Sequence, residues 1–247
     1  MAKTHYDDSF FDYQLEGSGM TAKEIIPVIY DVFKPQSVLD IGCGSAIWLR
    51  TFADMYKIAD IRGVDGDYVK KELLKIPAEK FASYDLTKFY DAGRQFDLAM
   101  SVEVAEHIPH ASSEAFVKTL VNASRKVVFS AAIPGQGGTY HVNEQYPEYW
   151  AERFAAHGYV TVDYFRKKFW DDSKVEWWYA QNIFIFIHKD ELANYPQLQD
   201  AYQKTDPEFI RRIHPGMLQS RELKIDRYKN PAKNLRHHLY LLKQKLK

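Results

Sequence analysis

The sequence contains a single cysteine, Cys43, among its 247 residues. One cysteine cannot form an intrachain disulfide or a thiolate metal cluster, and nothing in the cysteine content favours export. Apolar runs are short, since none reaches the roughly 18 residues that a membrane span needs, and the first ten residues lack the apolar core of a signal peptide. We therefore expect a cytoplasmic protein without a transmembrane segment.

The chain also lacks an excess of charge of either sign, because 33 Lys and Arg balance 33 Asp and Glu. The overall charge therefore gives no reason to expect nucleic acid or a membrane surface as a partner. With 46% apolar residues, the chain can bury one large core. We expect one main domain with appendages.

Short β-rich runs alternate with helical patterns over most of the chain, which predicts an α/β fold with helices on both faces of the sheet. Helices are expected over 21–33, 46–56, 68–76 and 112–124. Parallel strands are expected over 37–41, 61–65, 80–85, 96–102 and 126–133. Two more strand-like runs, 159–170 and 181–189, lie too close together for a helical crossover, so they should pair as an antiparallel hairpin.

The turn after the first strand, in VLDIGCG, carries two glycines. Gly42 and Gly44 would let a ligand approach the backbone, because glycine has no Cβ. A dinucleotide site would need a third glycine where Ile47 stands, and the Gly-Lys-Ser/Thr of a phosphate-binding loop is missing. Asp40 suits a cationic ligand better than a pyrophosphate. The alternative is an ordinary strand-to-helix turn.

Two aspartates follow at the ends of the next two expected strands. Asp65 comes 21 residues after Gly44, near the offset of about 20 residues at which an acidic side chain can accept ribose hydroxyls. Asp85 ends the third strand, where a simple turn residue is the alternative. The fourth strand ends in SVEVAEHIPH, residues 101–110.

These motifs resemble those of class I S-adenosylmethionine-dependent methyltransferases, and the resemblance covers residues 10–190. It implies a Rossmann-like sheet of five parallel strands plus a C-terminal antiparallel hairpin, with S-adenosyl-L-methionine as the cofactor. Cys43 is expected to be a small buried filler within the glycine turn. The resemblance implies a cofactor site made of Asp40, Gly42, Cys43, Gly44, Asp65, Gly66, Asp85, Leu86, Ser101, Val102 and Glu103.

Methyl transfer to a hydroxyl needs a group that takes up the hydroxyl proton. His141, in the polar loop after the fifth strand, is the first candidate base, with bracing of the loop as the alternative. Glu106 and His107 are further candidates, although His107 could instead be structural. Glu144 is expected to cap the helix that begins near Pro147. No metal site is expected, because adjacent Glu and His lack the i, i+4 histidine of a helical metal motif.

The loop after the fifth strand and the run WWYAQN, residues 177–182, resemble a branch of methyltransferases associated with bacterial glycan loci and viral genomes. This implies O-methylation of a sugar or glycan precursor, so the expected partner is a carbohydrate or other small-molecule acceptor. A non-sugar metabolite as acceptor and a non-catalytic binding or assembly module are left open. The Asn/Asp-Pro-Pro-Tyr/Phe run typical of nucleic-acid methylation is missing after the fourth strand, so no nucleic acid is expected.

The expected organisation is an N-terminal lid and helix (1–34), an S-adenosylmethionine-binding methyltransferase domain (35–190) and a helical basic C-terminal extension (191–247). Residues 221–247 hold nine basic and two acidic side chains. Leu235, Leu239, Leu242 and Leu246 recur there near one helical face. Such a helix could pack on its own domain, contact an oligomer mate or a glycan-assembly partner, or bind a membrane surface.

Overall fold

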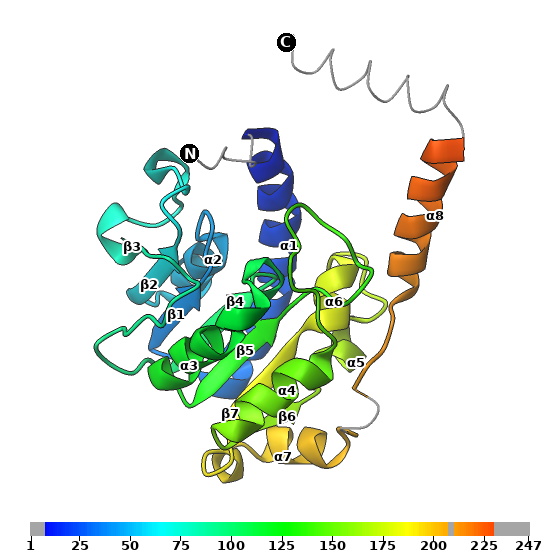
Figure 1. Ribbon diagram of the computed structural model, residues 1–247. Coiled ribbons are helices and arrows are strands. Elements are labelled where there is room, and N and C mark those ends of the chain that lie inside the picture. The colour runs from blue at the N-terminus through cyan, green and yellow to red at the C-terminus, as the bar shows by residue number, and fades with distance from the viewer. Residues whose placement is uncertain (1–7, 207–209, 230–247) are drawn as a thin grey trace. The chain divides into compact units, whose positions relative to one another are not determined.

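The computed structural model describes residues 8–206 and 210–229 (Figure 1). The described residues up to Arg212 form one compact unit, and those from Ile213 onward form a second. Within these described ranges, no helix is both long and apolar enough to cross a membrane. The first unit holds the whole of the sheet.

Seven strands form one sheet in the order β3-β2-β1-β4-β5-β7-β6. Strands β1 to β5 are parallel, and β7 runs antiparallel to both β5 and β6. This confirms the expected Rossmann-like sheet with a terminal antiparallel pair. The strands are β1 Ser37–Ile41, β2 Asp60–Asp65, β3 Phe81–Ser83, β4 Leu98–Val102, β5 Lys126–Ser130, β6 Tyr159–Val162 and β7 Phe184–His188.

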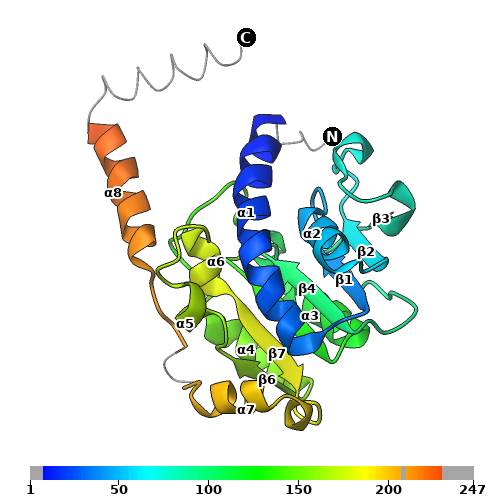
Figure 2. The same cartoon turned by 180° about the vertical axis from the view of Figure 1, so that it is seen from behind.

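Helices cover both faces of the sheet. Figure 1 shows α3 and α4 on one face, and Figure 2, seen from behind, shows α1 and α2 on the other. Two further helices lie between β6 and β7, and another follows β7. The helices of the first unit are α1 Asp8–Phe33, α2 Ile47–Tyr56, α3 Ser113–Ala123, α4 Pro147–Ala156, α5 Arg166–Phe169, α6 Trp177–Asn182 and α7 Pro196–Gln203.

The apolar core is divided by the sheet into two clusters. Because successive strand residues point to opposite faces, Val38 of β1 packs on the side of α1 and α2, whereas its neighbour Leu39 packs on the side of α3 and α4. Phe52 of α2 fills the first cluster, and Phe116 of α3 and Trp150 of α4 fill the second. Burial on both faces holds the carboxyl ends of the parallel strands in register.

The expected connection between the last two strands is wrong, because α5 and α6 lie between β6 and β7. The run 159–170 is a strand only as far as Val162. Beyond it, Phe165 and Phe169 are four residues apart, both are buried, and their rings stack. Arg166 is buried with them and forms an ion pair with Asp163. Helical spacing of buried side chains therefore prevails over a longer strand.

The expected helix over 68–76 is also wrong. Only a single 3-10 turn, Lys71–Leu73, forms there, and none of its side chains is buried. A short helix without a packed apolar face is not stable in water. Helix α1 begins at Asp8 and is therefore longer than the expected 21–33.

The second unit contains helix α8, Pro215–Lys229. Its apolar side chains Leu218, Leu223 and Ile225 are exposed. The expected leucine face at 235, 239, 242 and 246 lies outside the described residues, so its proposed contacts remain predictions.

Candidate functional site

The glycine turn follows β1 and contacts the end of β2. The N–H groups of Gly42 and Cys43 both donate to the Val64 carbonyl, at 2.7 and 3.2 Å. Gly42 has a φ of 83°, and a Cβ built on it would lie 2.4 Å from both methyl carbons of Val104. Gly44 has a φ of 52°, but no heavy atom of the described residues lies within 4 Å of an added Cβ. Only Gly42 is therefore required by packing as well as by conformation.

Asp65 closes this turn from the end of β2. Its carboxylate is 3% exposed and accepts hydrogen bonds from the N–H groups of Gly44 and Gly66, both at 2.7 Å, and from the Tyr68 hydroxyl. Burial raises the pKa of Asp65, although these hydrogen bonds act in the opposite direction. Burial, with the charge of Asp65 as a smaller cause, raises the pKa of Asp40 to about 8.

A cleft of about 730 Å³ opens at the carboxyl ends of β1 to β4, within the range of sites for small molecules and cofactors. Among the described residues, seven of the eleven expected cofactor residues line this cleft. The other four, Asp40, Cys43, Ser101 and Val102, do not. The lining consists of Gly42, Gly44, Asp65, Gly66, Asp67, Tyr68, Ser83, Tyr84, Asp85, Leu86, Thr87, Glu103, Val104, His107, Ile108 and Tyr140.

Asp85 combines the two roles that its position allows. It lines the cleft, and it also accepts hydrogen bonds from the hydroxyl and the N–H of Thr87, at 2.6 and 3.1 Å. These bonds, with a smaller effect from nearby Lys88, lower the pKa of Asp85. Its carboxylate is therefore charged at the mouth of the cleft and fixed by a local turn.

Glu103 begins a buried polar network at the end of β4. Its backbone has a φ of 55°, and its N–H donates to both oxygens of Ser130. Its carboxylate accepts hydrogen bonds from the side-chain amides of Gln136, at 2.9 Å, and Asn182, at 3.1 Å. Burial raises the pKa of Glu103 to about 7. The sequence analysis missed Gln136 and Asn182, since they meet only through the folded contact between the β5–α4 loop and α6.

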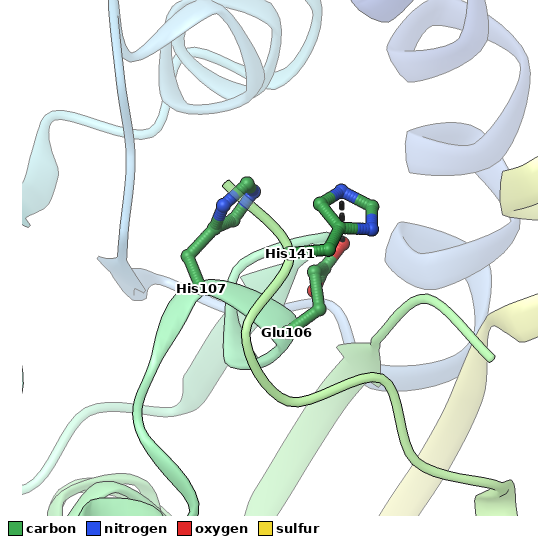
Figure 3. Close-up of side chains that lie close together, drawn as sticks. All are labelled: Glu106, His107 and His141. Carbon is green, nitrogen blue, oxygen red and sulfur yellow. Dashed lines mark ion pairs between the residues drawn. The ribbon is translucent and has the colours of Figure 1, made fainter. Parts of the chain in front are cut away.

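Glu106, His107 and His141 lie close together (Figure 3), and His107 lines the cleft. The first two belong to the 3-10 turn Ala105–His107 after β4, and His141 belongs to the loop after β5. The His107 and His141 ring centroids are 4.9 Å apart, and His141 Nε2 lies 4.0 Å from Glu106 Oε1. The structure therefore brings the three expected catalytic residues into one cluster, of which His107 lines the cleft.

Backbone hydrogen bonds hold the two segments of this cluster together. The N–H groups of Val142 and Asn143 both donate to the Glu106 carbonyl at 2.9 Å. Gly138 packs against the Nε2 end of the His141 imidazole, because a Cβ on it would lie 2.1 Å from Nε2. The position of His141 is thus set by backbone contacts of its own loop.

Glu144 does not cap α4, contrary to expectation, because the helix has no side-chain cap in this structure. Its carboxylate instead accepts hydrogen bonds from the N–H groups of Gly135 and Gly137, at 2.8 and 2.6 Å, and lies 2.9 Å from His141 Nδ1. The loop therefore orients His141 through a carboxylate that is itself held by the backbone.

Electrostatics differ sharply between the members of the cluster. Glu106 is 1% exposed, and burial, together with the charge of Glu103, raises the pKa of its carboxyl well above the usual value. Burial and neighbouring His141 lower the pKa of His107 to about 4, which leaves this imidazole neutral at pH 7. A neutral imidazole offers a lone pair for a proton or a metal ion.

Comparison with known proteins gives a family and a set of structural neighbours. Residues 22–195 match the family model described as a methyltransferase domain. The methyltransferase domain of bacterial CtHen1-C aligns with a TM-score of 0.50 at 18% identity, over 68% of this chain and 97% of that chain. The curated proteins contain no match.

Two further solved structures are similar in the same way. CalS10, an amino pentose methyltransferase from Micromonospora echinaspora solved with S-adenosylmethionine bound, aligns with a TM-score of 0.55 at 15% identity, over 76% of this chain and 100% of that chain. DesVI from Streptomyces venezuelae aligns with a TM-score of 0.54 at 14% identity, over 73% and 95%. At these identities the neighbours show a common fold.

The matched region contains all seven strands and the residues that line the cleft. The cofactor of this family is S-adenosylmethionine, and the cleft, with glycines on one wall and carboxylates at its strand ends, fits a ligand of that size and positive charge. The chain therefore belongs to the methyltransferase domain family, as its sheet order and its glycine turn independently indicate.

Proposed function

We propose that this protein transfers a methyl group from S-adenosylmethionine to a hydroxyl of a sugar or glycan precursor. The observation that carries the proposal is the position of the Glu106, His107 and His141 cluster at the edge of a cleft already lined by Gly42 and Asp65. One part of the site suits the cofactor, and the adjoining part offers groups that can take up a proton.

On the cofactor side, the proposed contacts follow the strand ends. Gly42 and Gly44 allow close approach of the amino-acid part of the ligand, Asp65 accepts the ribose hydroxyls, and Asp85 with Leu86 contacts the adenine. S-adenosylmethionine bound there would supply an electrophilic methyl group next to the acceptor. Asp65 is suited to its role, because the backbone N–H groups of Gly44 and Gly66 fix its carboxylate before any ligand arrives.

On the acceptor side, the Glu106, His107 and His141 cluster removes the proton of the attacking hydroxyl. A sugar hydroxyl is a poor nucleophile near its usual pKa, so proton removal is needed for transfer. The tautomer of His141 that donates Nδ1–H to Glu144 leaves Nε2 with its lone pair, facing Glu106. The cluster and the bound cofactor would together align the reacting atoms.

A carbohydrate acceptor is favoured by two independent likenesses. The structural neighbour CalS10 is an amino pentose methyltransferase, and the β5–α4 loop resembles that of methyltransferases associated with bacterial glycan loci and viral genomes. Methylation of a non-sugar metabolite, and a binding module without catalysis, are the competing outcomes of the experiment below.

Calorimetry with S-adenosylmethionine tests the cofactor site directly. Asp65→Ala should weaken binding by at least about tenfold, since a hydrogen bond to a charged group contributes about 1.5–3 kcal/mol. Asp54→Ala is the matched control. Asp54 is exposed, its ion pair is with Arg50, and it lies outside the described lining of the cleft. Equal affinity of the two variants would refute the assignment of Asp65.

An acceptor screen scored by release of S-adenosylhomocysteine tests the substrate class. We expect turnover with nucleotide sugars and none with phenols. Turnover of phenols alone would favour the metabolite alternative, and tight cofactor binding without turnover of any acceptor would favour a binding module.

A further inference from the structure

We infer that Glu106, His107 and His141 form a binding site for a divalent transition-metal ion beside the proposed methyl-transfer cleft. Each of the three side chains offers one ligand atom, and the three atoms lie within 4.8 Å of one another. Two imidazole nitrogens and one carboxylate oxygen are a donor set for ions such as Zn²⁺, Co²⁺ or Mn²⁺. The i, i+4 spacing argument from the sequence considers ligands on one helix only, whereas these come from two segments.

The second nitrogen of each imidazole already has a partner, as it does in most metal-bound histidines. His107 Nδ1 lies 3.2 Å from the Tyr140 carbonyl, and His141 Nδ1 lies 2.9 Å from the Glu144 carboxylate. Both partners are acceptors, so both Nδ1 atoms carry the proton. Each Nε2 is then left as a lone-pair donor, which is the tautomer that binds a metal ion.

The carboxylate of Glu106 supplies an independent sign of a ligand. It is 1% exposed, and its Oε2 has no hydrogen-bond partner among the residues that the structure describes. A buried carboxyl oxygen without a partner is costly in either protonation state of the group, because its desolvation is not compensated. A bound cation next to it would remove that cost.

The spacing of the ligand atoms requires only a small adjustment on binding. Metal–ligand bonds of about 2.0–2.2 Å at a tetrahedral angle put ligand atoms roughly 3.3–3.6 Å apart. His141 Nε2 and Glu106 Oε1 are 4.0 Å apart, and the largest separation in the cluster is below 4.8 Å. Shifts of about one ångström or less in the two imidazole rings would bring the ligand atoms to this spacing.

Three protein ligands leave at least one coordination position open, which is typical of catalytic rather than structural metal sites. His107 and Tyr140 line the cleft, so this open position lies near its contents. If the proposed function holds, an acceptor hydroxyl that occupied it would lose its proton to solvent water more easily on the metal, and the three side chains would then act as ligands instead of taking up that proton themselves. This part of the inference rests on the proposed function, whereas the metal site itself does not.

Direct titration of the metal-stripped full-length protein tests the site. We expect saturable binding of one Co²⁺ per chain, followed by visible absorption of the bound ion, and competition by Zn²⁺ in calorimetry. Glu106→Gln, His107→Ala and His141→Ala should each weaken Co²⁺ binding by roughly 100-fold or more, and Glu144→Gln by roughly 10–100-fold, because it replaces the carboxylate beside a ligand's second nitrogen with a neutral amide.

His157→Ala is the matched control, because His157 also lies within hydrogen-bond distance of a glutamate, Glu114, at 2.8 Å, yet lies outside the cluster. It should bind Co²⁺ like the unchanged protein. Thermal unfolding of every variant verifies that it is folded. The inference is refuted if the unchanged protein shows no saturable binding of Co²⁺. It is also refuted if those variants of Glu106, His107 and His141 that are folded bind Co²⁺ as tightly as His157→Ala. Metal binding without S-adenosylmethionine binding would overturn the proposed function alone.

Discussion

A methyl group added to Gly42 probes how closely the glycine turn packs against the end of β4. The added Cβ would lie 2.4 Å from both Val104 methyl carbons, and the φ of 83° is unfavourable for alanine. The left-handed conformation costs about 1–2 kcal/mol, and overpacking of a buried site typically adds about 1–3 kcal/mol. Gly42→Ala should therefore lower the free energy of unfolding by about 2–5 kcal/mol.

Gly44→Ala is the matched comparison two residues away. Its φ of 52° also lies in the left-handed region, but within the part of the chain that the structure describes no heavy atom is within 4 Å of the added Cβ. Only the conformational cost remains, so the expected loss is about 1–2 kcal/mol. The difference between the two variants isolates the contact with Val104.

Urea unfolding of both variants, with and without Val104→Ala, completes the test. Removing the two methyl groups should relieve the clash at Gly42, so the double variant should be more stable than the sum of the single changes predicts, by about 0.5–3 kcal/mol. The same substitution should show no such coupling with Gly44→Ala. Equal losses for the two glycine variants, or additive effects of Gly42→Ala and Val104→Ala, would refute the reasoning.

Two further predictions concern buried charges. The pKa of Asp40 is about 8 in the folded protein against 3.8 as the reference, so its protonated form stabilises the fold at low pH and this stabilisation is lost as the pH rises towards 8. In urea unfolding, the unchanged protein should therefore lose stability relative to Asp40→Asn between pH 4 and 8, and a pH-independent difference would contradict this. Arg166→Met removes a buried guanidinium and leaves the Asp163 carboxylate, whose side chain is 20% exposed, without its ion pair, and it should cost about 1.5–3 kcal/mol. The double variant Arg166→Met with Asp163→Asn should lose less than the sum of the single losses, and strict additivity would count against the pair.

The sheet could be predicted from the sequence because each strand is a short apolar run next to a turn. Its order then follows from the family that the glycine turn and SVEVAEHIPH resemble. The helices α5 and α6 could not be predicted, since an aromatic run such as 159–170 fits a strand as well as a helix. Its outcome is decided by tertiary packing, in which Phe165 and Phe169 stack in the core and Arg166 pairs with Asp163.

The candidate site was predictable to a similar degree. Gly42, Gly44, Asp65 and Asp85 were identified because each lies at a strand end, where the chain order itself sets the position. The contact of His141 with Glu106 could not be foreseen, because it depends on hydrogen bonds between the β5–α4 loop and the turn after β4. Ligands from two segments do not leave a local spacing signal in the sequence.

The hydrogen bonds of Glu144 to Gly135 and Gly137 close the loop after β5 upon itself. An insertion beside Thr139, between the two glycines and Tyr140, would therefore leave the attachment of the loop to the sheet in place. Each doubling of a flexible loop adds only about 0.6 kcal/mol to the free energy of closure. Related enzymes could thus accommodate acceptors of different size by lengthening or shortening this one stretch, while His141 keeps its place.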